Sequence, residues 1–410
     1  MTHTVRVLLA LLFAMVPGPA GSGSQTLGLL DSQTVLPGID VLLTDSVHLI
    51  AGKRLGLITN QTGVDAHGVS TIDRLYAATR PDSRFPIPDS RLVALFAPEH
   101  GIRGAARPGE LVSDTSDGAT GLPIYSLYGT NRAPTADQLN GLDVLIVDLQ
   151  DVGARTFTYV STMVLAIRAA KAAGKRVLVL DRPNPIGCAM EGPVLDAAYA
   201  SFIGMLPIPL RHGMTMGELA RFANAELHIR ADLVVVPMQG WRRCMWFDET
   251  GLPWVRPSPN LPDLEAVAWY PGTVLFEATN LSVGRGTDAP FRQVGAPWLQ
   301  LPTPAQTGGV PWDAVRFTPQ APGDGKYAGI EVVGRRLPAF DRRRNAAVAE
   351  AIGTLWILSR GNRDSLTIDA RGLAIRLGVA WSPDSGITAV LARVPVERFR
   401  RRAQRYFLYR

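Results

Sequence analysis

The stretch from Leu92 to Gly104, LVALFAPEHGIRG, constrains the fold of this chain more than any other feature. Its apolar first half, rich in Leu, Val and Phe, predicts a strand that is buried on both faces. The strand ends at Pro98, and Glu99 and His100 follow at once. In open α/β sheets, ligands bind outside the carboxyl ends of the strands, so this position favours a functional site. Glu99 is the leading candidate for chemistry, with helix capping or pairing with Arg103 as the alternative.

Similar apolar stretches recur in the first 254 residues and alternate with segments of helical periodicity. The predicted strands are 54–59, 144–147, 176–180 and 233–237, and the predicted helices are 70–78, 159–173 and 217–226. This alternation predicts an α/β fold, a Rossmann-like and mainly parallel sheet with helices on both faces. Neither a G-x-G-x-x-G turn nor a P-loop is present, so no nucleotide cofactor is expected.

After residue 254 the sequence changes in character. Stretches rich in Pro and Gly (PSPN, YPG, GRGTDAP and VGAP) predict loops, and they are followed by strand-like pieces at 315–318 and 329–333, a helix at 345–359 and an amphipathic segment at 396–409. We therefore expect a Rossmann-like catalytic domain at 25–254 and a smaller α+β domain at 255–410 that completes a cleft. Clefts between domains are common ligand sites.

The N-terminus predicts export. Arg6 precedes an apolar run at 7–16 that is followed by small residues, so residues 1–24 are expected to be a signal peptide, with an uncleaved anchor as the alternative. The run is too short to span a bilayer, and no membrane span is expected after its removal. Cys188 and Cys244 are the only cysteines. The oxidising periplasmic or extracellular environment would permit a bond between them.

The net charge of +6 is mild, and many arginines crowd the last segment of the chain. Such a run is more often the solvated face of a terminal helix than a polymer-binding surface. No motif of a nucleic-acid module accompanies it, so no nucleic-acid partner is expected.

Carboxylates at the strand ends suit hydrolysis of a glycosidic bond, which needs an acid and usually a second group that acts as nucleophile or base. The candidates are Glu99, Asp148, Asp151, Asp181, Glu191, Glu218 and Glu277. Asp151 can instead pair with Arg155, and Asp181 with Arg182. Polar side chains suited to binding a sugar are Asn60, Gln61, Gln150, Arg155, Tyr159, Arg182, Asn184, His212, Asn260, Asn280 and Arg285.

Other reaction classes lack their sequence signals. His100 and His212 could join the acidic residues around a metal ion, but no spacing of the H-E-x-x-H kind is present, so no metal is expected. No G-x-S-x-G turn supports a serine nucleophile.

Several longer strings together resemble the bacterial exo-β-N-acetylmuramidases. They are GKRLGLITNQTGV, LFAPEHGIRG, TGLPIYSLYG, DLQDVGARTFTY, LDRPNPIG, EGPVLD, PIPLRHGMTMGELA, GLPWVRPSPNLP and FEATNLSVGRGTDAPF, in order from about Gly38 to Tyr409. The resemblance implies a Rossmann-like domain joined to a smaller one, with the active site between them. It also implies release of N-acetylmuramic acid from the non-reducing ends of peptidoglycan fragments.

The resemblance further implies that Glu99 is the catalytic carboxylate, with His100, the 148–159 block and the 182–184 block lining the pocket. A basic residue suits the lactyl carboxylate of muramic acid, and Arg155, Arg182 and Arg285 compete for that role. For the second catalytic group we expect Asp151, and less strongly Tyr159. Two alternatives stay open, a metal-dependent hydrolase and a non-catalytic protein that binds the cell wall.

Overall fold

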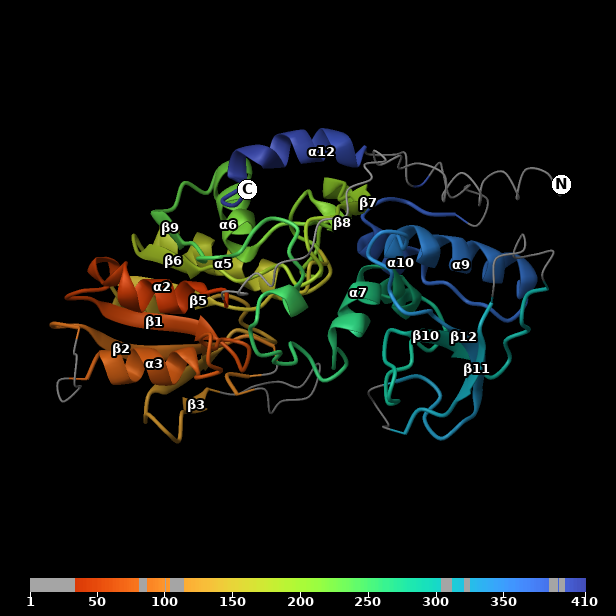
Figure 1. Cartoon of the computed structure of the whole chain (residues 1–410), viewed down its shortest axis with the longest axis horizontal. Helices are drawn as coiled ribbons and strands as arrows, with labels where there is room; N and C mark the ends of the chain where they lie inside the picture. Colours follow the sequence, from red (N-terminus) through yellow and green to blue (C-terminus); the bar gives the residue numbers. More distant parts are fainter. Residues whose placement is uncertain are drawn as a thin grey trace, which may run out of the picture.

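The computed structural model forms two lobes that lie side by side (Figure 1). It describes residues 34–80, 87–99, 101–103, 114–303, 312–320, 325–382, 390 and 395–410. The predicted signal peptide at 1–24 and the candidate residue His100 lie outside these ranges. The N-terminal lobe carries the larger sheet, which positions the strand ends considered above.

A mainly parallel sheet forms the centre of the N-terminal lobe. Its strand order is β3-β4-β2-β1-β5-β6-β9, and every neighbouring pair is parallel except β3 with β4. The strands are β1 Arg54–Thr59, β2 Arg91–Ala97, β3 Thr115–Ser116, β4 Pro123–Ser126, β5 Val144–Asp148, β6 Arg176–Leu180 and β9 Leu233–Val236. The predicted strands match β1 and β6 in full and β2, β5 and β9 to within one residue at each end.

Alternate residues of the central strands point to opposite faces of the sheet, and both faces are buried. On β5, Val144 and Ile146 join one core cluster, whereas Leu145 and Val147 join the other. The first cluster includes residues of α2 (Gly38–Thr44) and α3 (Thr71–Ala78), and the second includes residues of α5 (Tyr159–Ala172) and α6 (Met216–Glu226). The predicted Rossmann-like class with helices on both faces is therefore confirmed.

Capping groups fix where the helices of this lobe begin. The Ser70 hydroxyl accepts the Ile72 N–H at the start of α3, and Thr215 and Glu218 form a capping box at the start of α6. A second capping box starts the short helix α4 (Ala136–Asn140). Each cap satisfies backbone donors that have no partner within the helix.

The C-terminal lobe is built around a small antiparallel sheet of order β10-β12-β11. Its elements are α7 Leu264–Thr273, a 3-10 helix at Val274–Ala278, β10 Gln293–Ala296, β11 Ala314–Phe317, β12 Val332–Arg336, α9 Ala347–Gly361 and α10 Ala370–Leu377. Helices and an antiparallel sheet together make the predicted α+β architecture. The exact domain boundary, between residues 254 and 255, stays a prediction.

Two of the predicted loops in this lobe are wrong. The YPG segment lies inside α7, and VGAP begins within β10. In both, glycine permits a close backbone contact rather than a turn. A Cβ on Gly272 would overlap the Ala347 carbonyl oxygen of α9, and one on Gly295 would overlap the Val333 carbonyl oxygen of β12.

The end of the chain returns to the N-terminal lobe. Helix α12 (Val396–Ala403) packs Phe399 on Phe222 of α6, with ring centroids 5.7 Å apart. Figure 1 shows α12 next to α6, close to the C-terminus. Only this part of the predicted segment 396–409 is α-helical, and a 3-10 turn at Gln404–Tyr406 follows. No helix within the described ranges is both long and apolar enough to cross a membrane.

Cys188 and Cys244 form a disulfide. It joins the loop after β6 to the loop after β9, and the two cysteines are 56 residues apart in sequence. The segment between them holds the hairpin β7 (Glu191–Val194) and β8 (Pro209–Arg211), helix α6 and strand β9. The bond therefore restricts the unfolded chain over a long stretch.

We expect the double substitution Cys188→Ala and Cys244→Ala to lower the free energy of unfolding by about 4 kcal/mol, from the loss of loop-closure entropy in the unfolded state. Urea unfolding of the two proteins, followed by far-ultraviolet circular dichroism, measures the difference. A change below about 1 kcal/mol would contradict the chain-entropy argument for this bond.

Candidate functional site

Glu99 lies two residues beyond β2, at the carboxyl edge of the sheet, and its side chain is half-buried. The Thr158 hydroxyl, from the residue that precedes α5, donates to Glu99 Oε2 at 2.9 Å. The next residue, Tyr159, directs its hydroxyl to the carbonyl oxygens of Glu99 and Pro257, at 3.4 and 3.2 Å. The start of α5 thus holds both the backbone and the side chain of Glu99.

Three tyrosines lie near enough to Glu99 to feel its charge. Burial is the main cause that raises the pKa of Tyr128, Tyr159 and Tyr270, and the negative charge of Glu99 raises all three further. Phe157 packs against two of these rings, with centroids 4.6 Å from Tyr159 and 6.3 Å from Tyr270. Glu99 therefore lies in a mainly aromatic setting, and of the three phenols the Tyr128 hydroxyl is the one that interacts with its side chain by a hydrogen bond.

A second carboxylate reaches this region from the C-terminal lobe. Glu277 lies in the 3-10 helix after α7 and pairs with Arg285, whose Nε and Nη2 donate to Oε1 at 2.8 and 2.6 Å. Arg285 also stacks on Phe291, which packs on Tyr270. After burial, the charge of Glu277 is the largest cause that raises the pKa of Tyr270, ahead of the charge of Glu99. Tyr270 therefore feels the charge of carboxylates from both lobes.

Asp148 and Arg182 form a buried ion pair. Arg182 donates to the carboxylate through Nε at 2.5 Å and through Nη2 at 2.8 Å, and the Thr71 hydroxyl donates to Oδ2 at 2.5 Å. Arg182 Nη2 also donates to the Val64 carbonyl. The pair thus ties the ends of β5 and β6 to the loop after β1 and to α3.

Asp151 and His212 form a second buried pair. The Met214 N–H donates to Nδ1 of His212, so Nε2 carries the proton and donates to Asp151 Oδ2 at 3.0 Å. The Gly153 N–H donates to the same oxygen at 2.6 Å. His212 is completely buried and Asp151 is 2% exposed, so the pair holds the turn after β5 from inside the fold.

Gln150 and Asn184 connect the loops around these pairs. Gln150 Nε2 donates to the Pro183 carbonyl at 2.7 Å, and Asn184 Nδ2 donates to the Met214 carbonyl at 3.0 Å. Both side chains are buried. Their amide groups hold the strand-end loops at fixed distances from one another.

Arg155 connects the two lobes. Its Nη1 donates to the carbonyls of Pro193 and Ile208, and its Nη2 donates to the carbonyl of Arg376 in α10. Burial lowers the pKa of Arg155 to about 9, so the guanidinium still carries its charge at neutral pH. These bonds occupy both terminal nitrogens, which makes Arg155 a structural link rather than a free carboxylate ligand.

The predicted sugar-binding asparagines and Gln61 differ in their hydrogen-bond partners. Asn60 Oδ1 accepts the Thr62 N–H, whereas Gln61 Nε2 donates to the Arg256 carbonyl. Within the described chain, Asn60 Nδ2 and Asn260 Nδ2 are buried without a hydrogen-bond partner. Asn280 closes a loop of the C-terminal lobe through Ser365 and Thr367. Asn60 also acts on Tyr159, whose pKa its side chain lowers, so it belongs to the surroundings of Glu99.

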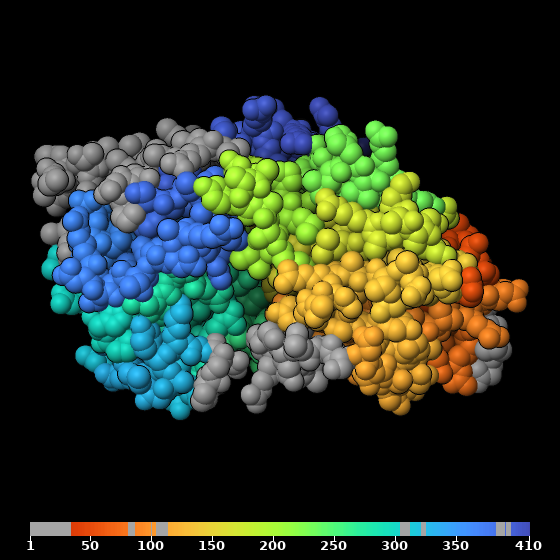
Figure 2. All heavy atoms as spheres, turned by 180° about the vertical axis from the view of Figure 1, so that it is seen from behind, coloured from red at the N-terminus to blue at the C-terminus, as the bar shows by residue number. Residues whose placement is uncertain are grey.

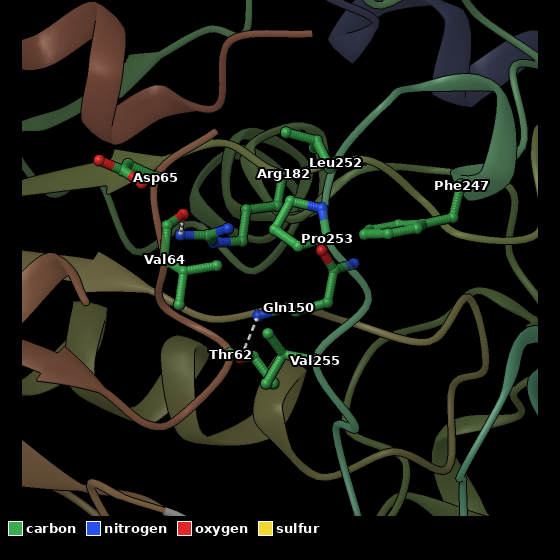
Figure 3. A pocket seen from close by; sticks show the side chains of 9 residues that line it. All are labelled: Thr62, Val64, Asp65, Gln150, Arg182, Phe247, Leu252, Pro253 and Val255. Atoms are coloured by element: carbon green, nitrogen blue, oxygen red, sulfur yellow. Dashed lines mark hydrogen bonds between the residues drawn. The ribbon is translucent and has the colours of Figure 1, made fainter. Parts of the chain in front are cut away.

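A small pocket beside the Asp148–Arg182 pair is lined by residues other than Glu99 (Figure 3). Its lining residues are Thr62, Val64, Asp65, Gln150, Arg182, Phe247, Leu252, Pro253 and Val255. Its polar side chains are engaged: Asp65 pairs with Arg74, and Gln150 donates to the carbonyls of Asp151 and Pro183. We therefore place the candidate site at Glu99 and not in this pocket.

The other acidic candidates have structural partners. Glu191 pairs with Arg211, and Glu218 pairs with Arg243. Asp181 is buried and accepts the hydroxyls of Thr215 and Tyr409 at 2.8 and 2.6 Å. No group of three His, Cys, Asp or Glu side chains suited to a metal ion occurs in the part of the chain that the structure describes.

Sequence reasoning missed Tyr128 and Tyr270, and it included Thr158 only as part of the 148–159 block, without a role of its own. Tyr128 carries a usable signal, because it follows the end of β4 by two residues, as Glu99 follows β2. Thr158 precedes a predicted helix, which is also a recognisable position. Tyr270 carries none, because it comes from the other lobe and lies inside a helix that was expected to be a loop.

The fold and the site define a class of protein. The surface is hollowed where the two lobes meet (Figure 2). A half-buried carboxylate from one lobe and an ion-paired carboxylate from the other, both acting on the aromatic Tyr270, form the kind of site that glycoside hydrolases use.

Comparison with known proteins gives the family. Sequence models of the exo-beta-N-acetylmuramidase NamZ match this chain, the N-terminal one at residues 55–265 and the C-terminal one at 268–409. The chain belongs to this family, as the sequence resemblance predicted. The peptidoglycan beta-N-acetylmuramidase NamZ of Bacillus subtilis strain 168 is 46% identical to it over 328 residues, which are 78% of this chain and 76% of that protein.

Solved structures agree with this assignment. Crystal structures of two DUF1343 family proteins of Bacteroides fragilis each have a TM-score of 0.75 to this chain. Their sequence identities are 32% and 30%, and each match covers 92% of this chain and 99% of the other. The two-lobe architecture is therefore shared over nearly the whole chain.

The buried Asp181 predicts a pH dependence of stability. Burial raises its pKa to about 6 from an ordinary 3.8, so the folded state binds this proton more tightly than the unfolded state. The contribution of Asp181 to the free energy of unfolding should fall by about 2 kcal/mol as the pH rises from 4 to 7. Asp181→Asn removes the titration, so urea unfolding at several pH values should show wild type losing more stability than the variant across this window. Parallel pH profiles of the two proteins would contradict the assignment.

Proposed function

We propose that this protein is an exo-acting glycoside hydrolase that releases N-acetylmuramic acid from the non-reducing ends of peptidoglycan fragments, with Glu99 as general acid. The observation that carries the proposal is the position of Glu99, half-buried at the carboxyl edge of the sheet and held through Oε2 by Thr158. Membership of the exo-beta-N-acetylmuramidase family supports the substrate class. His100 adjoins Glu99 in sequence and stays in the proposal as a site residue.

Elimination supports Glu277 as the second carboxylate. Asp151, the residue expected for this role from the sequence, is buried against His212. Glu277 keeps 22% of its side-chain surface exposed, and it forms an ion pair with Arg285. Tyr159 is completely engaged in holding the Glu99 and Pro257 backbones.

The two carboxylates divide the proton transfers of hydrolysis. Glu99 gives its proton to the glycosidic oxygen as the bond from that oxygen to the anomeric carbon breaks. The oxygen of a water molecule bonds to the anomeric carbon, and Glu277 accepts the proton that this water loses. Glu277 stabilises the positive charge that develops on the sugar ring, because its own charge is held in place by Arg285.

The protein acts outside the cytoplasm in this proposal. The disulfide between Cys188 and Cys244 supports an oxidising compartment, because such bonds are rare in reducing ones. The sequence of residues 1–24 supports export by a cleaved signal peptide. The substrate of the proposed reaction is found in the same location.

Substitution of Glu99 tests the general acid. Glu99→Gln keeps the size of the side chain but has no proton to give, so we expect turnover to fall by about 10²-fold or more. Protein lacking residues 1–24 is incubated with a disaccharide that bears non-reducing N-acetylmuramic acid, with and without chelator, and free sugar is measured by mass spectrometry. The control is Glu331→Gln, which removes a carboxylate 60% exposed on the far lobe.

Full activity of the Glu99 variant would remove this residue from the mechanism. Loss of wild-type activity in chelator, with recovery on adding metal, would support a metal-dependent hydrolase instead. Tight binding of the saccharide without any product would support a protein that only binds the cell wall.

Substitution of Glu277 tests the second carboxylate. We expect Glu277→Ala to lower kcat by about 10²-fold or more, with partial recovery in added azide or formate, since a small anion can enter the space of the missing carboxylate. A purely structural role for the Glu277–Arg285 pair predicts a lower melting temperature and no recovery with the anion. Unchanged kcat would exclude Glu277 from the reaction.

A further inference from the structure

The next inference rests on the proposed function and concerns how the site selects its sugar. N-acetylmuramic acid differs from N-acetylglucosamine by a lactyl ether that ends in a carboxylate. A guanidinium group is suited to bind the sugar that carries this carboxylate selectively, because the planar group can donate two parallel hydrogen bonds to a carboxylate. The site therefore needs an arginine near Glu99 whose donors are not already engaged.

The three arginines expected from the sequence have other partners. Arg182 is paired with Asp148, Arg285 is paired with Glu277, and Arg155 donates to backbone carbonyls on both lobes. Two of them, Arg155 and Arg182, are also at most 4% exposed. Arg182 and Arg285 are thus already paired with carboxylates, and Nε of Arg155, which has no hydrogen-bond partner in the described chain, is buried away from a substrate.

Arg132 differs from these three. It lies in the segment between β4 and α4, its side chain is exposed, and no carboxylate pairs with it within the described ranges. Its guanidinium carbon lies 4.3 Å from the centroid of the Phe202 ring. The ring covers one face of the guanidinium and leaves the in-plane N–H donors at its edge available.

The position of Arg132 places it beside the candidate site. Tyr128, four residues earlier, adjoins Glu99, and its pKa responds to the charges of Glu99 and Arg132 in opposite directions. On the surface, the gold region around residue 130 adjoins the yellow-green region around residue 200, next to the hollow between the lobes (Figure 2). Ser201 Oγ, next to Phe202, is buried without a hydrogen-bond partner in the described chain.

We infer that Arg132, held over the Phe202 ring, binds the lactyl carboxylate of N-acetylmuramic acid and so determines the specificity of the site. The carboxylate lies in the plane of the guanidinium and accepts hydrogen bonds from its edge. Phe202 fixes the orientation of that plane, and its ring gives the lactyl methyl group an apolar surface. Arg132 is a specificity residue in this inference and takes no part in bond breaking.

Two chromogenic substrates test the inference, the 4-nitrophenyl β-glycoside of N-acetylmuramic acid and the same glycoside with its lactyl group as the carboxamide. We expect Arg132→Gln to lower kcat/KM for the acid by about 10- to 100-fold, mainly through KM, and to change kcat/KM for the amide by less than about 3-fold. Arg132→Lys keeps the positive charge but loses the planar guanidinium, so its kcat/KM for the acid should lie between those of wild type and the Gln variant. Arg168→Gln, on the exposed face of α5, is the matched control and should leave kcat/KM unchanged for both substrates.

The outcomes separate this inference from the proposed function. Suppose that wild type cleaves the acid substrate. If Arg132→Gln then lowers kcat/KM equally for the acid and the amide, or for neither of them, Arg132 does not bind the lactyl carboxylate. If wild type cleaves neither substrate, the proposed function fails. Calorimetric binding of free N-acetylmuramic acid and its carboxamide to wild type and Arg132→Gln then still decides the inference: a preference for the acid that disappears in the variant supports it, and equal preferences overturn it.

Discussion

The buried ion pair between Asp148 and Arg182 is the interaction on which the rest of the site depends. It joins the ends of two neighbouring strands to the loop after β1 and to α3, through Val64 and Thr71. Two charges this deeply buried are stable only together, because removing one leaves the other uncompensated at a cost of about 3–5 kcal/mol. The pair therefore fixes where the chain leaves β5. From there the chain runs through the Asp151–His212 turn to Thr158, which holds Glu99.

This arrangement separates two kinds of polar residue at the same edge of the sheet. The inner residues, such as Asp148 and Asp151, have partners inside the protein and give the loops their shape. The outer residues, Glu99 and Glu277, keep part of their surface accessible. A site that acts on a sugar needs both kinds of residue. The outer residues contact the sugar, and the inner residues keep the loops rigid, because a small movement of a loop takes a catalytic acid out of reach of the bond that it protonates.

The sequence was sufficient to predict five strands of the large sheet and the helices α3, α5 and α6, but not to separate these two kinds of residue. Strands β1 and β6 are identifiable because burial on both faces requires uninterrupted apolar residues, and Glu99 is identifiable because it follows such a strand. The partners of Asp148, in contrast, are 77 and 34 residues away, and no local pattern reports them. Tyr270 was missed for a related reason, since its role depends on how α7 packs against the other lobe.

Because Glu99 and Glu277 come from different lobes, the packing of the lobes sets the distance between them. If the two act as proposed, that distance decides the stereochemistry of the reaction. Arg155 is a strong constraint on that packing. Its buried guanidinium donates to the hairpin of one lobe and to α10 of the other, so movement of the lobes would leave a buried cation without its carbonyl partners. Gly378, at the end of α10, has no side chain, and a Cβ there would lie 2.5 Å from Arg155 Nη2. The glycine that ends this helix is thus also what allows Arg155 to reach across and hold the two carboxylates at a fixed separation.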